Sequence, residues 1–353
     1  MAPIVALLGC WALADGGADH RVAARGYLLR TYARALDAGA ETVALAHMTH
    51  AYWLVAALRL AGGHDRVRAE DVLLLVAARR NTDGGYGATP GAESSALHTL
   101  AAVQLGALLG ELRALRADRA LHAFAHAQLR DSVGTAGCDA RQACCAVLTL
   151  RLLGTAPAAG SADAVALRDA ILRCRNWDGA FGGAPSAESH AGTTFCCIAT
   201  LGALGELGAL DRPDQTARWL VERQQPCGGF NGRPDKAADL CYTWWCAASL
   251  DMLGRMHWLD ARCALRFVER CAHADGGLAH APGELSDPYH TFFGLAARAL
   301  LVDALDEQLV NQRAVECAYA LPRSAVPADS RLCVVPLDQP LSLAPSTVWN
   351  ERH

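Results

Sequence analysis

Glycine-centred turns recur along this chain at a nearly constant interval, and that interval limits what the chain can fold into. The turns centre on Gly39, Gly84, Gly134, Gly179, Gly228 and Gly276, which follow one another at intervals of 45 to 50 residues. Such a period is long enough for two helices and two connections. Six units therefore predict about twelve helices.

Each turn separates two kinds of segment. The segment before a turn is amphipathic, as in RAEDVLLLVAARR, whereas the segment after it is apolar on all sides, as in FCCIATLGAL and YTWWCAASLDML. An amphipathic helix has one face in water, and a helix that is apolar all round is buried. We therefore expect an all-α protein in which outer helices face solvent and inner helices face a shared centre, an α6–α6 toroid of helix-pair repeats. An open HEAT-type solenoid is the competing shape, although its helix pairs would normally stay partly polar.

Composition supports a helical fold with a large core. Residues of apolar type make up 52% of the 353-residue chain, with alanine and leucine dominant, and both favour helix. We expect residues 20–320 to form one toroidal catalytic domain. A short N-terminal segment, 1–19, precedes it, and a proline-rich tail, 321–353, follows.

Charge and cysteine content narrow the class of protein. The formal net charge of -4 does not provide the basic face of a nucleic-acid binder, so no nucleic acid is expected as a partner. The 14 cysteines include tandem pairs but no CxxC motif, a pattern typical of buried thiols in a reducing compartment. The apolar N-terminus lacks the basic start of a secretory signal peptide. Later apolar runs are too short to cross a membrane. We expect a cytoplasmic protein.

The repeat also predicts which residues become neighbours. Four positions lie 14 residues after a turn glycine: His98, Thr193, Tyr242 and His290. They should occupy equivalent places near the N-terminal ends of inner helices. Residues about one repeat apart should therefore lie side by side around one rim of the toroid.

Asp239, Cys241 and His290 converge under this register. His290 follows Cys241 by one repeat, which puts it on the next inner helix. Carboxylate, thiolate and imidazole are zinc ligands, and three protein ligands leave the fourth position open, as in catalytic zinc sites. Taken singly, a helix N-cap, a small buried side chain and an ordinary core histidine explain the three residues better. Their convergence favours Zn²⁺.

Cationic groups gather beside the same expected rim. Arg233 and Lys236 lie in the loop before the inner helix that carries Cys241, and His190 lies in the matching loop one repeat earlier. Helix N-termini aim free N–H groups and their positive dipole ends at this rim, which makes it suitable for an anion with two phosphates. The alternative is a solvated loop in which Asp235 pairs with the two cations.

Aromatic residues on the expected inner helices indicate what lies below the rim. They are Trp53, Phe195, Tyr242, Trp244, Trp245, Phe292 and Phe293. Such residues can be ordinary core. Below a cationic rim, however, they predict an apolar funnel whose ligand is a long hydrocarbon with a diphosphate head.

Four sequence blocks resemble one known family in order. They are AESHAG followed by CC, GGFNGRPDKAADLCYTWW, GRMHWLD and DPYHTFFG. Together they resemble the protein prenyltransferase β subunits over about residues 20–320, and most closely the β subunits of the Rab (type II) geranylgeranyltransferases.

The resemblance implies zinc-dependent transfer of a geranylgeranyl group from geranylgeranyl diphosphate to C-terminal cysteines of Rab GTPases. It implies that Asp239, Cys241 and His290 hold zinc and that Tyr242 is catalytic. The residues it assigns to geranylgeranyl diphosphate are His190, Gly192, Arg233, Lys236, Tyr242, Trp245, Trp53 and Thr49. Thr49 stands where farnesyl enzymes close the pocket floor with a bulky aromatic. The implied partners are an α subunit, in a heterodimer, and a Rab GTPase presented by a Rab escort protein.

Two positions depart from the family pattern. Arg141 matches a residue that contacts the substrate's C-terminal region, but the turn before it is shorter than in relatives. His280 replaces a magnesium-binding Asp of the farnesyl enzymes, so no Mg²⁺ site is expected there. The alternatives are a β subunit of type I geranylgeranyltransferase or farnesyltransferase, and a non-catalytic helical-repeat scaffold. A triterpene cyclase is disfavoured because the chain has no DxDD segment.

Overall fold

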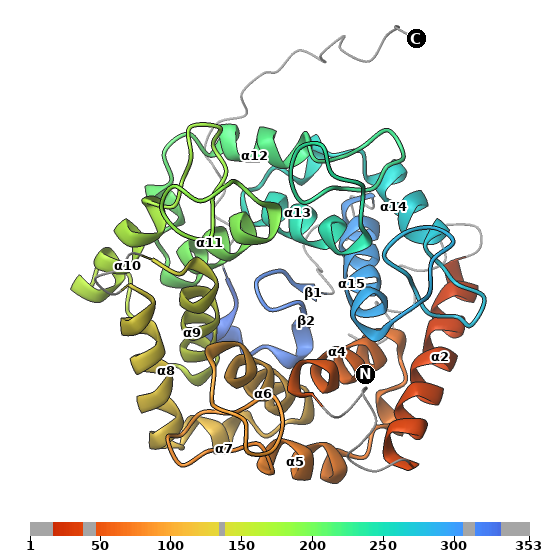
Figure 1. Ribbon diagram of the computed structural model, residues 1–353, viewed down its shortest axis with the longest axis horizontal. Coiled ribbons are helices and arrows are strands. Elements are labelled where there is room, and N and C mark those ends of the chain that lie inside the picture. Colours follow the sequence, from red (N-terminus) through yellow and green to blue (C-terminus); the bar gives the residue numbers. More distant parts are fainter. Residues whose placement is uncertain (1–16, 38–46, 134–137, 306–314, 333–353) are drawn as a thin grey trace, which may run out of the picture.

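The helices form two concentric rings (Figure 1). The structure is a computed structural model, and it describes residues 17–37, 47–133, 138–305 and 315–332. Two of the predicted turn glycines, Gly39 and Gly134, lie outside the described residues.

Helices of the two rings alternate along the chain. The outer ring contains α2 (Gly17–Asp37), α5 (Ala69–Ala77), α8 (Arg119–Ser132), α10 (Ala162–Leu172), α12 (Pro213–Val221) and α14 (Ala261–Arg270). The inner ring contains α4 (Met48–Ala61), α6 (Ala96–Leu109), α9 (Ala140–Leu153), α11 (Ala191–Leu204), α13 (Leu240–Met252) and α15 (Pro288–Leu305). Short helices between the ring helices are η2 (His64–Arg66), α7 (Leu112–Arg116), η3 (Leu207–Ala209) and η4 (Met256–Trp258), and two more, η5 (Arg323–Ala325) and η6 (Ala328–Ser330), follow the last inner helix. The predicted all-α toroid of six helix pairs is confirmed.

The turn glycines hold neighbouring units together. Four of them have left-handed backbone with φ between 89° and 97°: Gly84, Gly179, Gly228 and Gly276. A Cβ added to Gly228 would lie 2.2 Å from the carbonyl oxygen of Cys263 in the next outer helix. Only glycine permits both the conformation and this close approach.

The same contact closes the ring. A Cβ on Gly276 would lie 2.4 Å from the carbonyl oxygen of Ala23, so the last turn packs on α2, the first outer helix. Between the first and last inner helices, the rings of Trp53 and Tyr289 have centroids 4.7 Å apart. The open solenoid is therefore the wrong alternative.

The inner helices begin at a common rim. Their first N–H groups donate to the loop of the next unit: Met48 to Ala88, Ala140 to Gly183, Ala191 to Gly232 and Leu240 to His280, at 2.8 to 2.9 Å. The predicted register holds, because His98, Thr193, Tyr242 and His290 are each the third residue of an inner helix. Trp53 also follows its turn glycine, Gly39, by 14 residues in the sequence. It is nevertheless the sixth residue of α4 and lies one turn deeper, because α4 begins three residues sooner after its turn glycine than α6, α11, α13 and α15 do.

A small antiparallel sheet lies inside the ring near its centre (Figure 1). Its strands are β1 (Val315–Glu316) and β2 (Leu321–Pro322), in which Glu316 pairs with Leu321. The boundary expected between residues 320 and 321 thus falls between the hairpin turn and β2.

No helix in the described part of the chain is long and apolar enough to cross a membrane. The cysteines of the described residues are free thiols and most are buried, as predicted.

We predict that Gly228→Ala destabilises the fold strongly. The left-handed conformation alone costs an alanine about 1–2 kcal/mol, and here the new methyl group also meets the Cys263 carbonyl. Gly91→Ala is the matched control, since Gly91 has φ of 78° but no heavy atom within 4 Å of the place that a Cβ would take. Urea unfolding should show a clearly larger loss for Gly228→Ala, and equal losses would contradict this account of the turns.

Candidate active site

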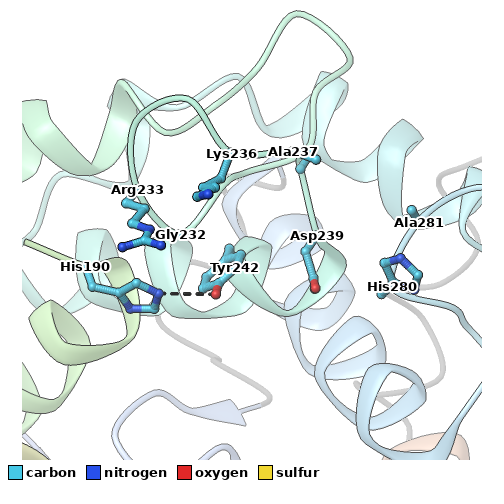
Figure 2. A pocket seen from close by; sticks show the side chains of 10 residues that line it. His190, Gly232, Arg233, Lys236, Ala237, Asp239, Tyr242, His280 and Ala281 are labelled. Atoms are coloured by element: carbon cyan, nitrogen blue, oxygen red, sulfur yellow. Dashed lines mark hydrogen bonds between the residues drawn. The ribbon is translucent and has the colours of Figure 1, made fainter.

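Two cavities meet at the rim. The first, the rim pocket, has a volume of about 590 Å³ and is lined by His190, Gly232, Arg233, Lys236, Ala237, Ala238, Asp239, Tyr242, His280 and Ala281 (Figure 2). The second, the central cavity, has a volume of about 400 Å³ and is lined mainly by apolar residues of all six inner helices. His190 and Tyr242 line both, so the two cavities adjoin.

Asp239, Cys241 and His290 meet as predicted. One ligand atom from each lies within 4.8 Å of the others. Asp239 is also the N-cap of α13, since its Oδ1 accepts the Cys241 N–H at 2.9 Å. The ordinary interpretation of Asp239 as a cap is thus correct and compatible with a metal site. One carboxylate, one thiol and one imidazole are a donor set that suits Zn²⁺ and leaves a fourth position open.

Asp287 orients His290 for such a role. The Nδ1 atom of His290 lies 2.6 Å from Asp287 Oδ2, and its Nε2 atom lies 3.3 Å from Asp239 Oδ1. A carboxylate that accepts the Nδ1 proton of a histidine leaves Nε2 to face a metal. Asp287 was missed from the sequence, although its place just before Pro288 at the start of α15 is a usual N-cap signal.

The electrostatics of the cluster favour a charged carboxylate and a charged imidazole but a neutral thiol. Burial opposes ionisation of His290, but its hydrogen bonds to Asp239 and Asp287 raise its pKa to about 9. Burial likewise opposes ionisation of Asp239, but hydrogen bonds from His290 and Cys241 hold its pKa below its usual range. Burial and then the Asp239 charge raise the pKa of the Cys241 thiol. A cation at this point would reverse the effect on the thiol.

Arg233 and Lys236 reach the rim pocket from one loop (Figure 2). Arg233 pairs with Glu188 of the neighbouring unit, and not with Asp235 as the solvated-loop alternative predicted. Lys236 is exposed. The side chains of both cations point to the pocket side of the loop in Figure 2, above Tyr242.

His190 and Tyr242 form a hydrogen-bonded pair between the two cavities. His190 Nδ1 accepts the Gly192 N–H at 3.1 Å, and its Nε2 lies 3.2 Å from Tyr242 Oη. Burial and then the charges of Arg233 and Arg141 lower the His190 pKa. The neutral ring therefore carries its proton on Nε2 and donates it to Tyr242 Oη. The Tyr242 O–H is then left to donate to a ligand.

Aromatic rings make much of the central cavity wall. Trp245 lies between Phe195 and Phe293, with ring centroids 4.7 Å and 4.6 Å away. Gly192 and Trp53 also line this cavity. Trp244 and Phe292, expected among the funnel aromatics, are instead fully buried in the core and do not line it.

Thr49 lines the central cavity near the N-terminal end of α4. It is the second residue of α4, as Cys241 is of α13, so it belongs to the rim end of the wall. Its hydroxyl lies 2.8 Å from His47 Nδ1. Tyr319 of the hairpin lines the cavity at a greater depth, because its carbonyl oxygen accepts a hydrogen bond from Gln104 Nε2, the ninth residue of α6. That Thr49 limits the length of the hydrocarbon stays a prediction.

Three further residues belong to these cavities. Arg141 lines the central cavity at the start of α9, and His280 lines the rim pocket beside Asp239. Tyr289, which the sequence reasoning missed, lines the central cavity with its ring against His290, at a centroid distance of 4.8 Å. Its position directly before His290 was the available signal.

Comparison with known proteins assigns the family. Residues 20–321 match the family described as Prenyltransferase alpha-alpha toroid domain. That match covers most of the chain, so the chain belongs to this family of toroids.

Individual relatives narrow the assignment. The geranylgeranyl transferase type-2 subunit beta of Saccharomyces cerevisiae is 33% identical over 261 residues, which are 71% of this chain and 79% of that protein. The type-2 subunit beta 1 of Arabidopsis thaliana is 40% identical over 143 residues, 40% of this chain and 42% of that protein. The motif-based prediction of a prenyltransferase β subunit, similar to type II, is confirmed.

A solved structure agrees in fold. Candida albicans protein geranylgeranyltransferase-I complexed with GGPP superimposes with a TM-score of 0.65, covering 79% of this chain and 89% of that one. The two chains are only 20% identical, so this likeness shows the shared toroid.

We predict that Cys241→Ala and His290→Ala each weaken zinc binding by more than about 100-fold, since loss of a partner outside the ligand shell already costs about 10–100-fold. Asp287→Asn should weaken zinc binding by only about 10–100-fold, because Asp287 contacts His290 and is not itself a proposed ligand. Cys246→Ala is the control, because Cys246 is a fully buried thiol on the same helix outside the cluster. Zinc titration of chelator-treated protein decides, and retention of full affinity in either alanine variant would refute the site.

Zinc affinity should also depend on pH. The His290 pKa of about 9 means that the imidazole holds a proton at neutral pH, and the Cys241 thiol holds one too. A metal must displace both protons, so affinity should fall as the pH is lowered below about 9. A pH-independent affinity would show that these groups are not the ligands.

Proposed function

We propose that this chain is the catalytic β subunit of a zinc-dependent protein geranylgeranyltransferase that modifies C-terminal cysteines of Rab GTPases. The observation that carries the proposal is the arrangement of three features at one rim. The metal-ligand cluster shares Asp239 with the cationic rim pocket and Cys241 with the aromatic central cavity, and the two cavities share Tyr242. An isoprenoid diphosphate is the ligand class that matches both cavities at once.

The cations of the rim pocket would bind the diphosphate. Arg233 and Lys236 supply positive charge, and the Tyr242 hydroxyl supplies a hydrogen bond that His190 orients. Charge grows on the leaving oxygen as the bond from the first isoprenoid carbon to oxygen breaks. Donors fixed around that oxygen stabilise the transition state more than the ground state.

The rest of the reaction is assigned to the cluster and the cavity. Zinc held by Asp239, Cys241 and His290 would lower the pKa of an acceptor cysteine so that a thiolate is present at neutral pH. The thiolate sulfur forms a bond to the first isoprenoid carbon, and diphosphate leaves with the electron pair of the broken bond. Trp245 and its aromatic neighbours hold the hydrocarbon in a site away from water.

The resemblance to β subunits supports the remaining partners. The relatives at 33% and 40% identity carry the name of type-2 beta subunits. On that basis we propose an α subunit as the stable partner, an escort protein that presents the Rab substrate, and a cytoplasmic location. Type I geranylgeranyltransferase is the second candidate, because the geranylgeranyl transferase type-1 subunit beta of Arabidopsis thaliana is 35% identical over 149 residues, 39% of this chain and 40% of that protein.

The deciding experiment uses the chain co-purified with its α subunit. Transfer of labelled geranylgeranyl should occur to a Rab–escort complex and only weakly to a peptide with a type I C-terminus. The reverse preference would favour the second candidate. Bound zinc without transfer to either acceptor, or the absence of zinc, would favour the alternative that the protein is a non-catalytic helical-repeat scaffold.

We predict that Tyr242→Phe slows transfer by about 10- to 100-fold with zinc content unchanged. The loss corresponds to one hydrogen bond to a charged group, worth about 1.5–3 kcal/mol. The slowing should fall mainly on kcat, because the bond strengthens as the diphosphate departs. Single-turnover kinetics measure it, and an unchanged rate would remove Tyr242 from the proposed machinery.

A further inference from the structure

The hairpin turn of residues 317–320 is buried in the middle of the toroid. It connects β1 to β2, and its four residues are each at most 5% exposed. Ala318, Tyr319 and Ala320 line the central cavity. They are its only lining residues, among those the structure describes, that do not come from an inner helix or its N-cap.

The turn lies well below the rim. The carbonyl oxygen of Tyr319 accepts hydrogen bonds from Tyr52 Oη at 2.9 Å and from Gln104 Nε2 at 3.0 Å. Gln104 stands eight residues beyond the start of α6, about 12 Å along that helix. On its other side, Tyr319 Oη donates to the Ser330 carbonyl, and Ser330 Oγ donates to the carbonyl of Arg151 in the last turn of α9.

These bonds fix the turn in place. Gln104 Nε2 also lies 3.2 Å from Tyr52 Oη, so Tyr52, Gln104 and the Tyr319 carbonyl form a closed buried group. Moving the turn away would leave these groups without partners in an apolar surrounding, which is costly. A hydrocarbon entering from the rim therefore meets a wall that does not readily give way.

We propose that the hairpin turn is the end stop of the lipid cavity and sets the longest isoprenoid chain that the protein accepts. This inference rests on the proposed function and adds a chain-length determinant outside the inner helices. Two of the three lining residues are alanines. Their small size leaves room that a larger side chain would take from the end of the hydrocarbon.

Ala320 and Ala318 allow tests in opposite directions, because one can be replaced by a smaller residue and the other by larger ones. Ala320 has a left-handed backbone with φ of 50°, so Ala320→Gly relieves strain while it removes a methyl group from the cavity end. Ala318 is not among the residues with positive φ, so Ala318→Leu and Ala318→Phe extend into the cavity without backbone strain. Ala328→Phe is the control, since Ala328 is exposed on η6 of the same C-terminal segment.

The test is a competition between donors of 15, 20 and 25 carbons in the full chain with its α subunit. Each methylene group of the donor that can no longer be buried lowers the affinity for that donor by about fourfold. Ala318→Leu should lower the ratio of kcat/KM for the 20-carbon over the 15-carbon donor, and Ala318→Phe should lower it by at least about tenfold, with the 15-carbon donor still used. Ala320→Gly should raise the relative use of the 25-carbon donor by about fourfold. Ala328→Phe should behave as wild type.

Zinc content and thermal melting identify variants that fail to fold. If the Ala318 variants fold poorly, Ala320→Gly alone tests the proposal, because glycine adopts a φ of 50° without strain. Unchanged donor ratios in folded variants, or equal loss of all donors, would overturn the end stop while leaving the proposed function intact. Transfer from no donor by the wild-type protein would instead overturn the proposed function, and this proposal with it.

Discussion

The close backbone contact between successive units is the constraint on which the site depends. At each described turn a left-handed glycine lets the chain pack against the next outer helix, and in four units the first N–H of the inner helix bonds to the following loop. These contacts put the N-termini of the inner helices at one level. Without that alignment, Cys241 and His290, about one repeat apart in sequence, would not share a ligand cluster.

The rim and the interior offer opposite environments to one ligand. At the rim, helix N-termini, Arg233, Lys236 and the polar pair of His190 and Tyr242 favour negative charge. A turn or two deeper, Trp245 and Phe293 exclude water. A molecule that is charged at one end and apolar along its length gains from both, whereas a purely polar or purely apolar ligand gains from one. The acceptor thiol would then approach where the two environments meet, beside Asp239.

The sequence predicted the features that periodicity controls. The six units, the rim register and the meeting of Asp239, Cys241 and His290 follow from an interval in the chain, and the structure agrees with each. The resemblance named eight lipid-site residues, and all of them line one of the two cavities. Their binding roles stay predictions.

Features set by contacts between distant segments escaped prediction. The hairpin turn enters the cavity from a stretch without helical periodicity, and no local pattern shows that Tyr319 meets Tyr52 and Gln104. The partner of Arg233 proved to be Glu188 from the previous unit and not its neighbour Asp235. Trp53 lies one turn deeper than the register predicts, because its level depends on where α4 begins.

X-ray absorption at the zinc edge of the αβ protein tests the central claim most directly, namely that an acceptor thiol meets the metal ligands at the rim. With zinc alone, the metal should have one sulfur ligand, from Cys241. Addition of the lipid diphosphate together with an acceptor ending in cysteine should raise the sulfur count to two. A count that stays at one, while transfer proceeds, would contradict the account.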